Sequence, residues 1–353
     1  MATETAGRSA PPAAAADVAA RLEPADRIAL LRYMLLMRGL EERAMNLYRQ
    51  GKVPGSFYDG FGQEAVSVGA AFALAPEDRL CVLHRDLGAH LIRGVTPERI
   101  LAQYMGREAG ITGGRDGNVH FGDHRTGCVG MVSMLPDMML VAAGMAMAFR
   151  IREERRVALT WFGDGSTSRG DFHEAMNWAG VQQLPVIFVL ENNQYAYSTP
   201  TTDQYAVNPV ERARAYGFPG VSVDGNDAEA MFAATLEARE RALDGGGPTL
   251  IEAVTMRMHG HAAHDDMKYV PKALLEEWRA KDPIDRQAAR VSALDVDVDA
   301  LRAEVRAEID AATQRALESP MPDPATATDR VFYAGDTDVL VEDGHAPYSA
   351  FAH

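Results

Sequence analysis

The stretch WFGDGSTSRGDFHEAMNWAGVQQLPVIFVLENNQYAYS, residues 161–198, contains two apolar runs that each end in polar residues. Val157–Phe162 leads into Gly163-Asp164-Gly165, and Val186–Leu190 leads into Glu191-Asn192-Asn193. Short apolar runs of this kind are typical of strands in a parallel sheet that is buried on both faces. The stretch therefore predicts an α/β fold in which both polar segments lie at the carboxyl ends of strands.

The alternation of strand and helix patterns continues on both sides of this stretch. Further strands are predicted at Val221–Val223 and Thr249–Val254. Apolar periodicity predicts helices over 24–50, 62–75, 97–107, 138–153, 170–181, 209–216, 227–243 and 272–318. The last of these is broken at Asp282-Pro283, and residues 110–130 hold seven glycines, which predicts a long functional loop. The pattern predicts a parallel sheet with helices on both faces and helical additions at the N- and C-terminal ends.

Three segments are expected along the chain. Residues 1–22 are rich in Ala and Pro and lack the apolar core of a signal peptide, so they are interpreted as a flexible tail. Residues 23–320 form one α/β domain, and residues 321–353 form a C-terminal extension.

Composition excludes several classes of function. The chain has 353 residues, 47% of them hydrophobic, and a formal net charge of −15. That charge argues against nucleic acid or an anionic membrane as the main partner, because both select a basic surface. The two cysteines, Cys81 and Cys128, provide neither a disulfide framework nor a zinc cluster. We therefore expect a reducing, cytoplasmic location.

The polar ends of the two strands suggest a metal–diphosphate site. If the strands are neighbours, Asp164 and Asn193 follow tips that lie about 5 Å apart. Carboxylate and amide oxygens suit Mg²⁺ or Ca²⁺ rather than zinc. The glycines allow close approach of a ligand, and the helix beginning near Gly170 directs its N-terminal amides to the same place, which favours a diphosphate. Either motif alone is commonly a turn, but the pair, 29 residues apart, is far more specific.

On these residues the chain resembles the alpha subunit of the thiamine diphosphate-dependent first component of 2-oxo acid dehydrogenases. This family includes pyruvate, branched-chain 2-oxo acid and acetoin dehydrogenases. The resemblance runs from about residue 25 to about residue 320. It includes the segments GSFYDGFGQEAVSVG, HRDLGAHLIRG, GGRDGNVHFGD, PGVSVDGNDA and GPTLIEAVTMRMHGH.

The resemblance implies a thiamine diphosphate-binding fold and a set of site residues. Asp164 and Asn193 would bind Mg²⁺ through their side chains, and Tyr195 would bind it through its backbone carbonyl. His261 would be the catalytic residue, in a loop over the cofactor. The cofactor-binding residues would be His84, Arg85, Ser133, Leu135, Gly163, Asp164, Gly165, Ser166, Asn193, Tyr195 and His261. His84 stands where the family usually has tyrosine.

The resemblance also implies partners and a reaction. The glutamate that activates the thiamine ring comes from a separate beta subunit in this family, so the active unit would contain two alpha and two beta chains. A 2-oxo acid would be decarboxylated, and its acyl group would pass to a lipoyl group on a partner acyltransferase. The substrate, pyruvate or a branched-chain 2-oxo acid, stays open. Acetoin dehydrogenase and a catalytically inactive binding paralogue are the alternatives.

Two other features have simpler interpretations. His259-Gly260-His261 could be a metal pair, but no third ligand has a recognisable spacing, and a mobile active-site loop over 256–271 is favoured. Glu64 could serve as a general acid. It begins a predicted helix, however, where a carboxylate complements the helix dipole, so a packing role is favoured.

Overall fold

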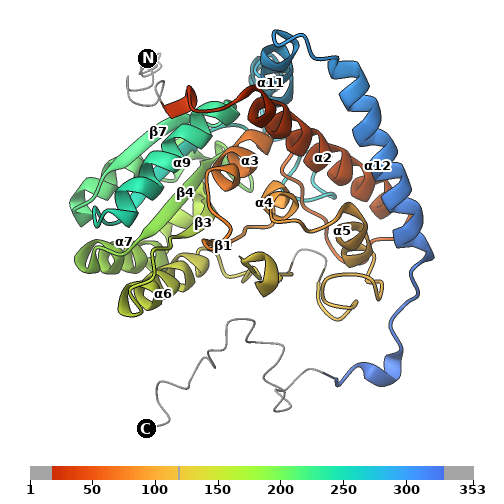
Figure 1. Ribbon diagram of the computed structural model, residues 1–353, viewed down its shortest axis with the longest axis horizontal. Helices are drawn as coiled ribbons and strands as arrows, with labels where there is room; N and C mark the ends of the chain where they lie inside the picture. The colour runs from red at the N-terminus through yellow and green to blue at the C-terminus, as the bar shows by residue number, and fades with distance from the viewer. Residues whose placement is uncertain (1–17, 118–119, 330–353) are drawn as a thin grey trace.

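The computed structural model describes residues 18–117 and 120–329 (Figure 1). Its centre is a six-stranded sheet in the order β2-β1-β3-β4-β8-β7, in which all neighbours are parallel. The strands are β1 (Arg79–Cys81), β2 (Cys128–Val129), β3 (Ala158–Gly163), β4 (Val186–Asn192), β7 (Gly220–Asp224) and β8 (Thr249–Val254). The predicted α/β fold with a parallel sheet is confirmed.

Strands β3 and β4 pair directly, as the opening stretch of sequence required. Their register runs from Ala158 opposite Val186 to Gly163 opposite Glu191. All residues of β4, and all of β3 except Gly163, are buried, which explains why both strands are continuous apolar runs rather than alternating ones. The two strands are therefore neighbours, which was the condition for a joint site at their tips.

Helices cover both faces of the sheet (Figure 1). On one face, Phe162 and Phe188 pack against α6 and α7. On the other face, Trp161 and Val189 pack against α3, α4 and α9. The helices are α2 (Pro24–Arg49), α3 (Glu64–Phe72), α4 (Leu87–Ile92), α5 (Pro97–Tyr104), α6 (Met138–Ile151), α7 (Gly170–Gln182), α8 (Pro209–Arg212), α9 (Ala228–Leu243), α10 (Lys272–Arg279), α11 (Pro283–Ser292) and α12 (Val298–Glu318).

The helical additions from the two ends of the sequence join into one layer. Figure 1 shows α12 running alongside α2, and buried residues of both helices share one apolar cluster with α5 and α11. A Cβ atom added at Gly39 would lie 2.5 Å from Ile309 Cδ1, so glycine allows α2 and α12 to approach closely. Asp282 caps α11 through its carboxylate, and Pro283 occupies the first helical position, as the sequence break predicted.

A buried ion pair connects this layer to the helices on the sheet. Arg38 of α2 donates to both carboxyl oxygens of Glu64 on α3, at 2.6 and 2.8 Å, and to Asp282 at 2.7 Å. The Glu64 side chain is fully buried. The packing interpretation of Glu64 thus agrees with the structure.

Replacing Arg38 with methionine should lower the free energy of unfolding by about 3–5 kcal/mol, because Glu64 would be left as an uncompensated buried charge. Chemical denaturation of the full chain measures this change. Arg32→Met is the matched control, since Arg32 sits on the same helix with partly exposed partners and should cost below about 1 kcal/mol. Equal losses in the two variants would contradict the assignment.

Three short elements were not anticipated from the sequence. Helix α4 and strand β1 have six and three residues, and β2 has two residues inside the predicted glycine-rich loop. β2 is held by pairing with β1, with Leu80 opposite Cys128. Segments this short carry no detectable periodicity, so the helix and the two strands become apparent only in the tertiary structure.

The ends of the chain are described only in part. Of the expected tail, 1–17 lie outside the described residues, while residues 18–22 form a helical turn with Val18 and Leu22 buried. Of the expected extension 321–353, the structure describes a short turn at Pro324–Thr326, and 330–353 lie outside it. None of the helices within 18–117 and 120–329 combines the length and apolar character needed to cross a bilayer.

Candidate active site

A cavity of about 340 Å³ lies at the carboxyl ends of β3 and β4, the usual ligand position in an open parallel sheet. Every site residue predicted from the sequence lines it, with the exception of Ser133. The lining residues are Leu83, His84, Arg85, Leu135, Gly163, Asp164, Gly165, Ser166, Arg169, Glu191, Asn193, Tyr195, Ala196, Tyr197, Arg257 and His261. Residues separated by more than a hundred positions in the sequence thus meet in one place.

The three predicted metal ligands meet at the side-chain amide of Asn193. The side-chain oxygen of Asn193 lies 3.3 Å from Asp164 Oδ1 and 3.1 Å from the carbonyl oxygen of Tyr195. The Asn193 amide nitrogen donates in the opposite direction, to Gln63 Oε1 at 3.0 Å. With no cation between the oxygens, a half-turn of the amide would be favourable, because its nitrogen would then donate to both. A hard cation reverses that preference, so this donor set fits Mg²⁺.

Asp164 has the character of a carboxylate that needs a cation. It is almost fully buried, and its Oδ2 accepts a hydrogen bond from Gln204 at 2.7 Å. Burial raises its pKa to about 6, although the Gln204 bond opposes this shift. A buried carboxylate is costly unless it is paired, and a divalent cation would supply that pairing.

The zinc interpretation of the two histidines gains no support. Among residues 18–117 and 120–329, no group of three or more His, Cys, Asp or Glu is arranged to hold a metal ion. The Asp164 cluster does not depend on such a group, since its donors are one carboxylate, one amide and one backbone carbonyl.

The chain between β3 and α7 is shaped for close approach of a ligand. It forms a short 3₁₀ turn, Asp164–Ser168. A Cβ atom at Gly165 would lie 2.5 Å from Ala196 Cβ, whereas Gly163 has open space on that side. Gly165 is therefore required by packing. Gly163 has no side chain to fill the adjacent space, so a ligand can approach its backbone. The N-terminus of α7 follows directly at Gly170 and favours an anionic group.

Two buried arginines face the cavity. Arg85 donates to the carbonyl oxygens of Asp59, at 2.5 Å, and His261, at 2.7 Å. Arg257 donates to the carbonyl oxygens of Tyr195, Tyr197 and His259. Burial, and next the guanidinium of Arg257, lower the pKa of Arg85. Both side chains still carry charge, and an anionic diphosphate would relieve their mutual repulsion.

Two neutral histidines complete the wall. Burial, and next Arg85, lower the pKa of His84 well below its usual value and that of His261 to about 4. The ring of Tyr58 contacts both of them, with its centroid 5.1 Å from that of His84 and 5.5 Å from that of His261. The buried Nε2 of His84 has no hydrogen-bond partner among the described residues, so it is free to contact a ligand.

Ser133 is the predicted residue that the cavity leaves out. It is exposed, and its hydroxyl contacts Nε2 of His120 instead. Leu135, two residues later, does line the cavity. Of this pair of predicted cofactor-binding residues, only Leu135 borders the cavity.

Three lining or supporting residues were missed from the sequence. Arg257 fixes the backbone at Tyr195, and Gln63 orients the Asn193 amide. Glu191 lies near the end of β4, and burial raises the pKa of Glu191 to about 7 and that of the neighbouring Asp86 well above its usual value. The sequence offered a signal for two of these residues. Arg257 is a charged residue inside the run TMRMHGH, and Glu191 directly follows the apolar run 186–190.

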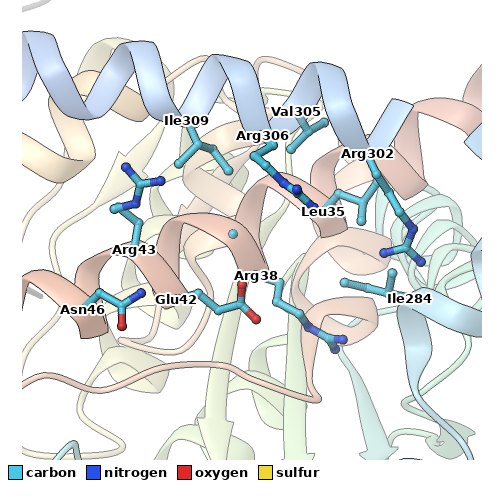
Figure 2. A pocket seen from close by; sticks show the side chains of 11 residues that line it. Leu35, Arg38, Glu42, Arg43, Asn46, Ile284, Arg302, Val305, Arg306 and Ile309 are labelled. Atoms are coloured by element: carbon cyan, nitrogen blue, oxygen red, sulfur yellow. The ribbon is translucent and has the colours of Figure 1, made fainter. Parts of the chain in front are cut away.

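A second cavity, of about 310 Å³, lies between α2 and α12, and Figure 2 shows arginines from both helices around it. Its charges are largely compensated: Arg38 pairs with Glu64 and Asp282, and Arg43 pairs with Asp310. Since it lies on the helical layer rather than at the strand ends, it is not the candidate site.

Comparison with known proteins identifies the kind of chain that has this geometry. Residues 32–325 match the model of the family described as dehydrogenase E1 component. The alpha subunit of 2-oxoisovalerate dehydrogenase from Bacillus subtilis is 38% identical over 315 residues, covering 87% of this chain and 95% of the relative.

Two further relatives have different names at similar identity. The alpha subunit of acetoin:2,6-dichlorophenolindophenol oxidoreductase from Cupriavidus necator is 36% identical over 310 residues, 85% of this chain and 93% of the relative. The pyruvate dehydrogenase E1 component subunit alpha from Rhizobium meliloti is 33% identical over 326 residues, 91% of this chain and 94% of the relative. The comparisons therefore identify the family and leave the substrate open.

Proposed function

This chain belongs to the family of 2-oxo acid dehydrogenase E1 alpha subunits, which depend on thiamine diphosphate, and we propose that it serves the decarboxylation of pyruvate or a branched-chain 2-oxo acid. In this proposal the acyl group passes to a lipoyl group of a partner acyltransferase. The active unit contains two alpha and two beta chains.

One observation carries the proposal. Asp164 and Asn193 directly follow the adjacent strands β3 and β4, and the Asn193 amide lies 3.3 Å from Asp164 Oδ1 and 3.1 Å from the carbonyl oxygen of Tyr195. We assign these three residues as Mg²⁺ ligands, with the turn at Gly163, Gly165 and Ser166 and the guanidinium of Arg85 holding the diphosphate. When bound, thiamine diphosphate supplies the nucleophilic carbon and the electron sink for decarboxylation.

His261 would act as a neutral hydrogen-bonding group at the mouth of the cavity. Its Nδ1 lies 3.4 Å from a guanidinium nitrogen of Arg85, which can only donate. Nδ1 is therefore the acceptor, and the ring proton sits on Nε2. We propose that the Nε2–H donates to the substrate or to the lipoyl group during acyl transfer. The pKa of His261, lowered to about 4, keeps the ring neutral at neutral pH, and the Arg85 contact favours the tautomer with the proton on Nε2.

The chain alone should not turn over. The described residues contain one parallel sheet, and the segment after β8 is helical, so they include no second thiamine-type domain that could supply the activating glutamate. Purified alone, the chain should release no CO₂ from a 2-oxo acid above the uncatalysed rate. Co-expressed with its beta subunit, it should release CO₂ and reduce an artificial electron acceptor. Full activity of the single chain would contradict the proposal.

A substrate panel with the co-expressed pair separates the remaining candidates. Pyruvate, 2-oxoisovalerate and acetoin are compared by kcat/KM. Acetoin dehydrogenase is the alternative favoured by the Cupriavidus necator relative. An inactive paralogue would bind thiamine diphosphate with Mg²⁺ weakly or not at all, so a titration with both present tests that second alternative.

A further inference from the structure

The segment Phe57–Gly62 connects α2 to α3 and lies against the loop 256–271 that carries His261. Two backbone bonds join them: Met258 N–H donates to the Phe61 carbonyl at 3.1 Å, and Ala263 N–H donates to the Phe57 carbonyl at 2.8 Å. At Gly62, where φ is +90°, a Cβ atom would lie 2.8 Å from a carbonyl of the loop. The two pieces are thus packed at backbone contact, although about two hundred residues separate them in the sequence.

Asp59 is the residue of this segment that reaches both sides of the site. Its backbone carbonyl accepts from Arg85 at 2.5 Å, and its carboxylate Oδ2 lies 2.9 Å from Nδ1 of His259. Oδ1 accepts from the Phe61 N–H at 3.2 Å. Burial opposes ionisation of Asp59, but the His259 bond and Arg85 bring its pKa below the usual value. The carboxylate is therefore ionised, and Nδ1 of His259 carries the shared hydrogen.

His259 is held in place but does not line the cavity. Its ring stacks on Phe61, with centroids 4.2 Å apart. The guanidinium of Arg38 lies over the Phe61 ring, 4.3 Å from its centroid. The His259 side chain is 43% exposed, and its carbonyl accepts from Arg257 at 3.1 Å. These contacts hold the backbone of the loop two residues before His261.

We propose that Asp59 is a positioning residue whose bond to His259 fixes the 256–271 loop so that His261 stays against Arg85 and the cavity. This inference rests on the proposed function for its catalytic consequence. The two roles of Asp59 are separable: its carbonyl orients Arg85 and survives a side-chain substitution, while its carboxylate orients the loop. Loss of the carboxylate should therefore affect His261 and leave the diphosphate and metal contacts in place.

Asp59→Asn tests the proposal first without activity. Hydrogen exchange of the full chain should speed up by roughly tenfold in 256–271, because a bond that restrains local opening is weakened. The affinity for thiamine diphosphate with Mg²⁺ should change by no more than about threefold, since Arg85 keeps its bond to the Asp59 carbonyl. Asp266→Asn is the matched control, because Asp266 is an exposed acid in the same loop that pairs with Lys268, and both readouts should stay at the wild-type value.

With the beta subunit present, Asp59→Asn should lower kcat for acyl transfer by roughly tenfold to a hundredfold with little change in KM for the 2-oxo acid, as expected for a misplaced catalytic group. His259→Gln should produce the same pattern. In the double variant the effects should not add, because both substitutions remove one interaction.

Wild-type exchange in Asp59→Asn, or additive effects in the double variant, would overturn the proposal. If Asp59→Asn does not fold, the same exchange measurement is made on His259→Gln, because a substitution at this partly exposed side chain should not prevent folding. Faster exchange in 256–271 would then support the proposal, and wild-type exchange would overturn it. If the exchange result is as expected but the wild-type pair decarboxylates none of the 2-oxo acids, the positioning bond stands and the proposed function fails.

Discussion

Replacing Asp164 with alanine is expected to abolish Mg²⁺-dependent binding of thiamine diphosphate by the alpha–beta pair. The variant removes the carboxylate of the proposed ligand set and leaves an amide and a carbonyl, which are too weak to hold the cation alone. Loss of an outer partner of a metal site typically costs 10–100-fold in affinity, so loss of a direct ligand should cost more than roughly a hundredfold. Isothermal titration with cofactor, in the presence and absence of Mg²⁺, measures it.

Asp203→Ala is the control for this variant. Asp203 is an exposed acid next to Gln204, the residue that hydrogen-bonds Asp164, so its loss changes the net charge equally without removing a ligand. Its affinity should stay near the wild-type value. Normal Mg²⁺-dependent affinity in Asp164→Ala would show that the oxygens of Asp164, Asn193 and Tyr195 are not the metal site.

Replacing His261 with alanine is expected to spare most cofactor binding and to slow acyl transfer by about a hundredfold or more, the usual contribution of a positioned proton-carrying group. The metal oxygens do not contact the imidazole, and Arg85 keeps its bonds to the carbonyl oxygens of Asp59 and residue 261 when the ring is removed, which is why the affinity should be spared. Decarboxylation measured with an artificial acceptor should fall less than acylation of a lipoyl domain. Single-turnover measurements of the two steps give both rates.

His264→Ala is the matched control, since His264 is the exposed histidine of the same loop. It should leave both steps unchanged. Equal losses in the two steps for His261→Ala, or a loss of cofactor affinity as large as that of Asp164→Ala, would assign His261 to the diphosphate instead of acyl transfer.

Much of the sheet and the main helices could be predicted because each leaves a periodic signal. Strands β3, β4 and β8 are long enough to appear as apolar runs, and α5 begins at Pro97 behind the Thr96 cap. Strands β1 and β2 give no such signal. β1 pairs with the edge of β3, and β2 pairs with the outer edge of β1, so each short strand satisfies unpaired backbone groups that become available only after the chain has folded.

The candidate site divides in the same way. Asp164 and Asn193 could be chosen because each directly follows a strand, and their strands proved to be neighbours. Arg257 and Asp59 could not, since one buried arginine or aspartate in a loop has no pattern of its own. Their roles come from contacts with Tyr195, Arg85 and His259 that no spacing in the sequence encodes.

The sequence by itself determined the α/β class, the polar tips of two strands and the family, because strand periodicity, glycine requirements and metal-ligand chemistry are local properties of residues. Only the tertiary structure decided that Ser133 lies outside the cavity and that Asp59 joins Arg85 to the loop of His261. The physical reason is burial. Whether a polar side chain faces solvent, a partner or a ligand depends on which distant segments exclude water around it, and this is fixed only when the whole chain packs.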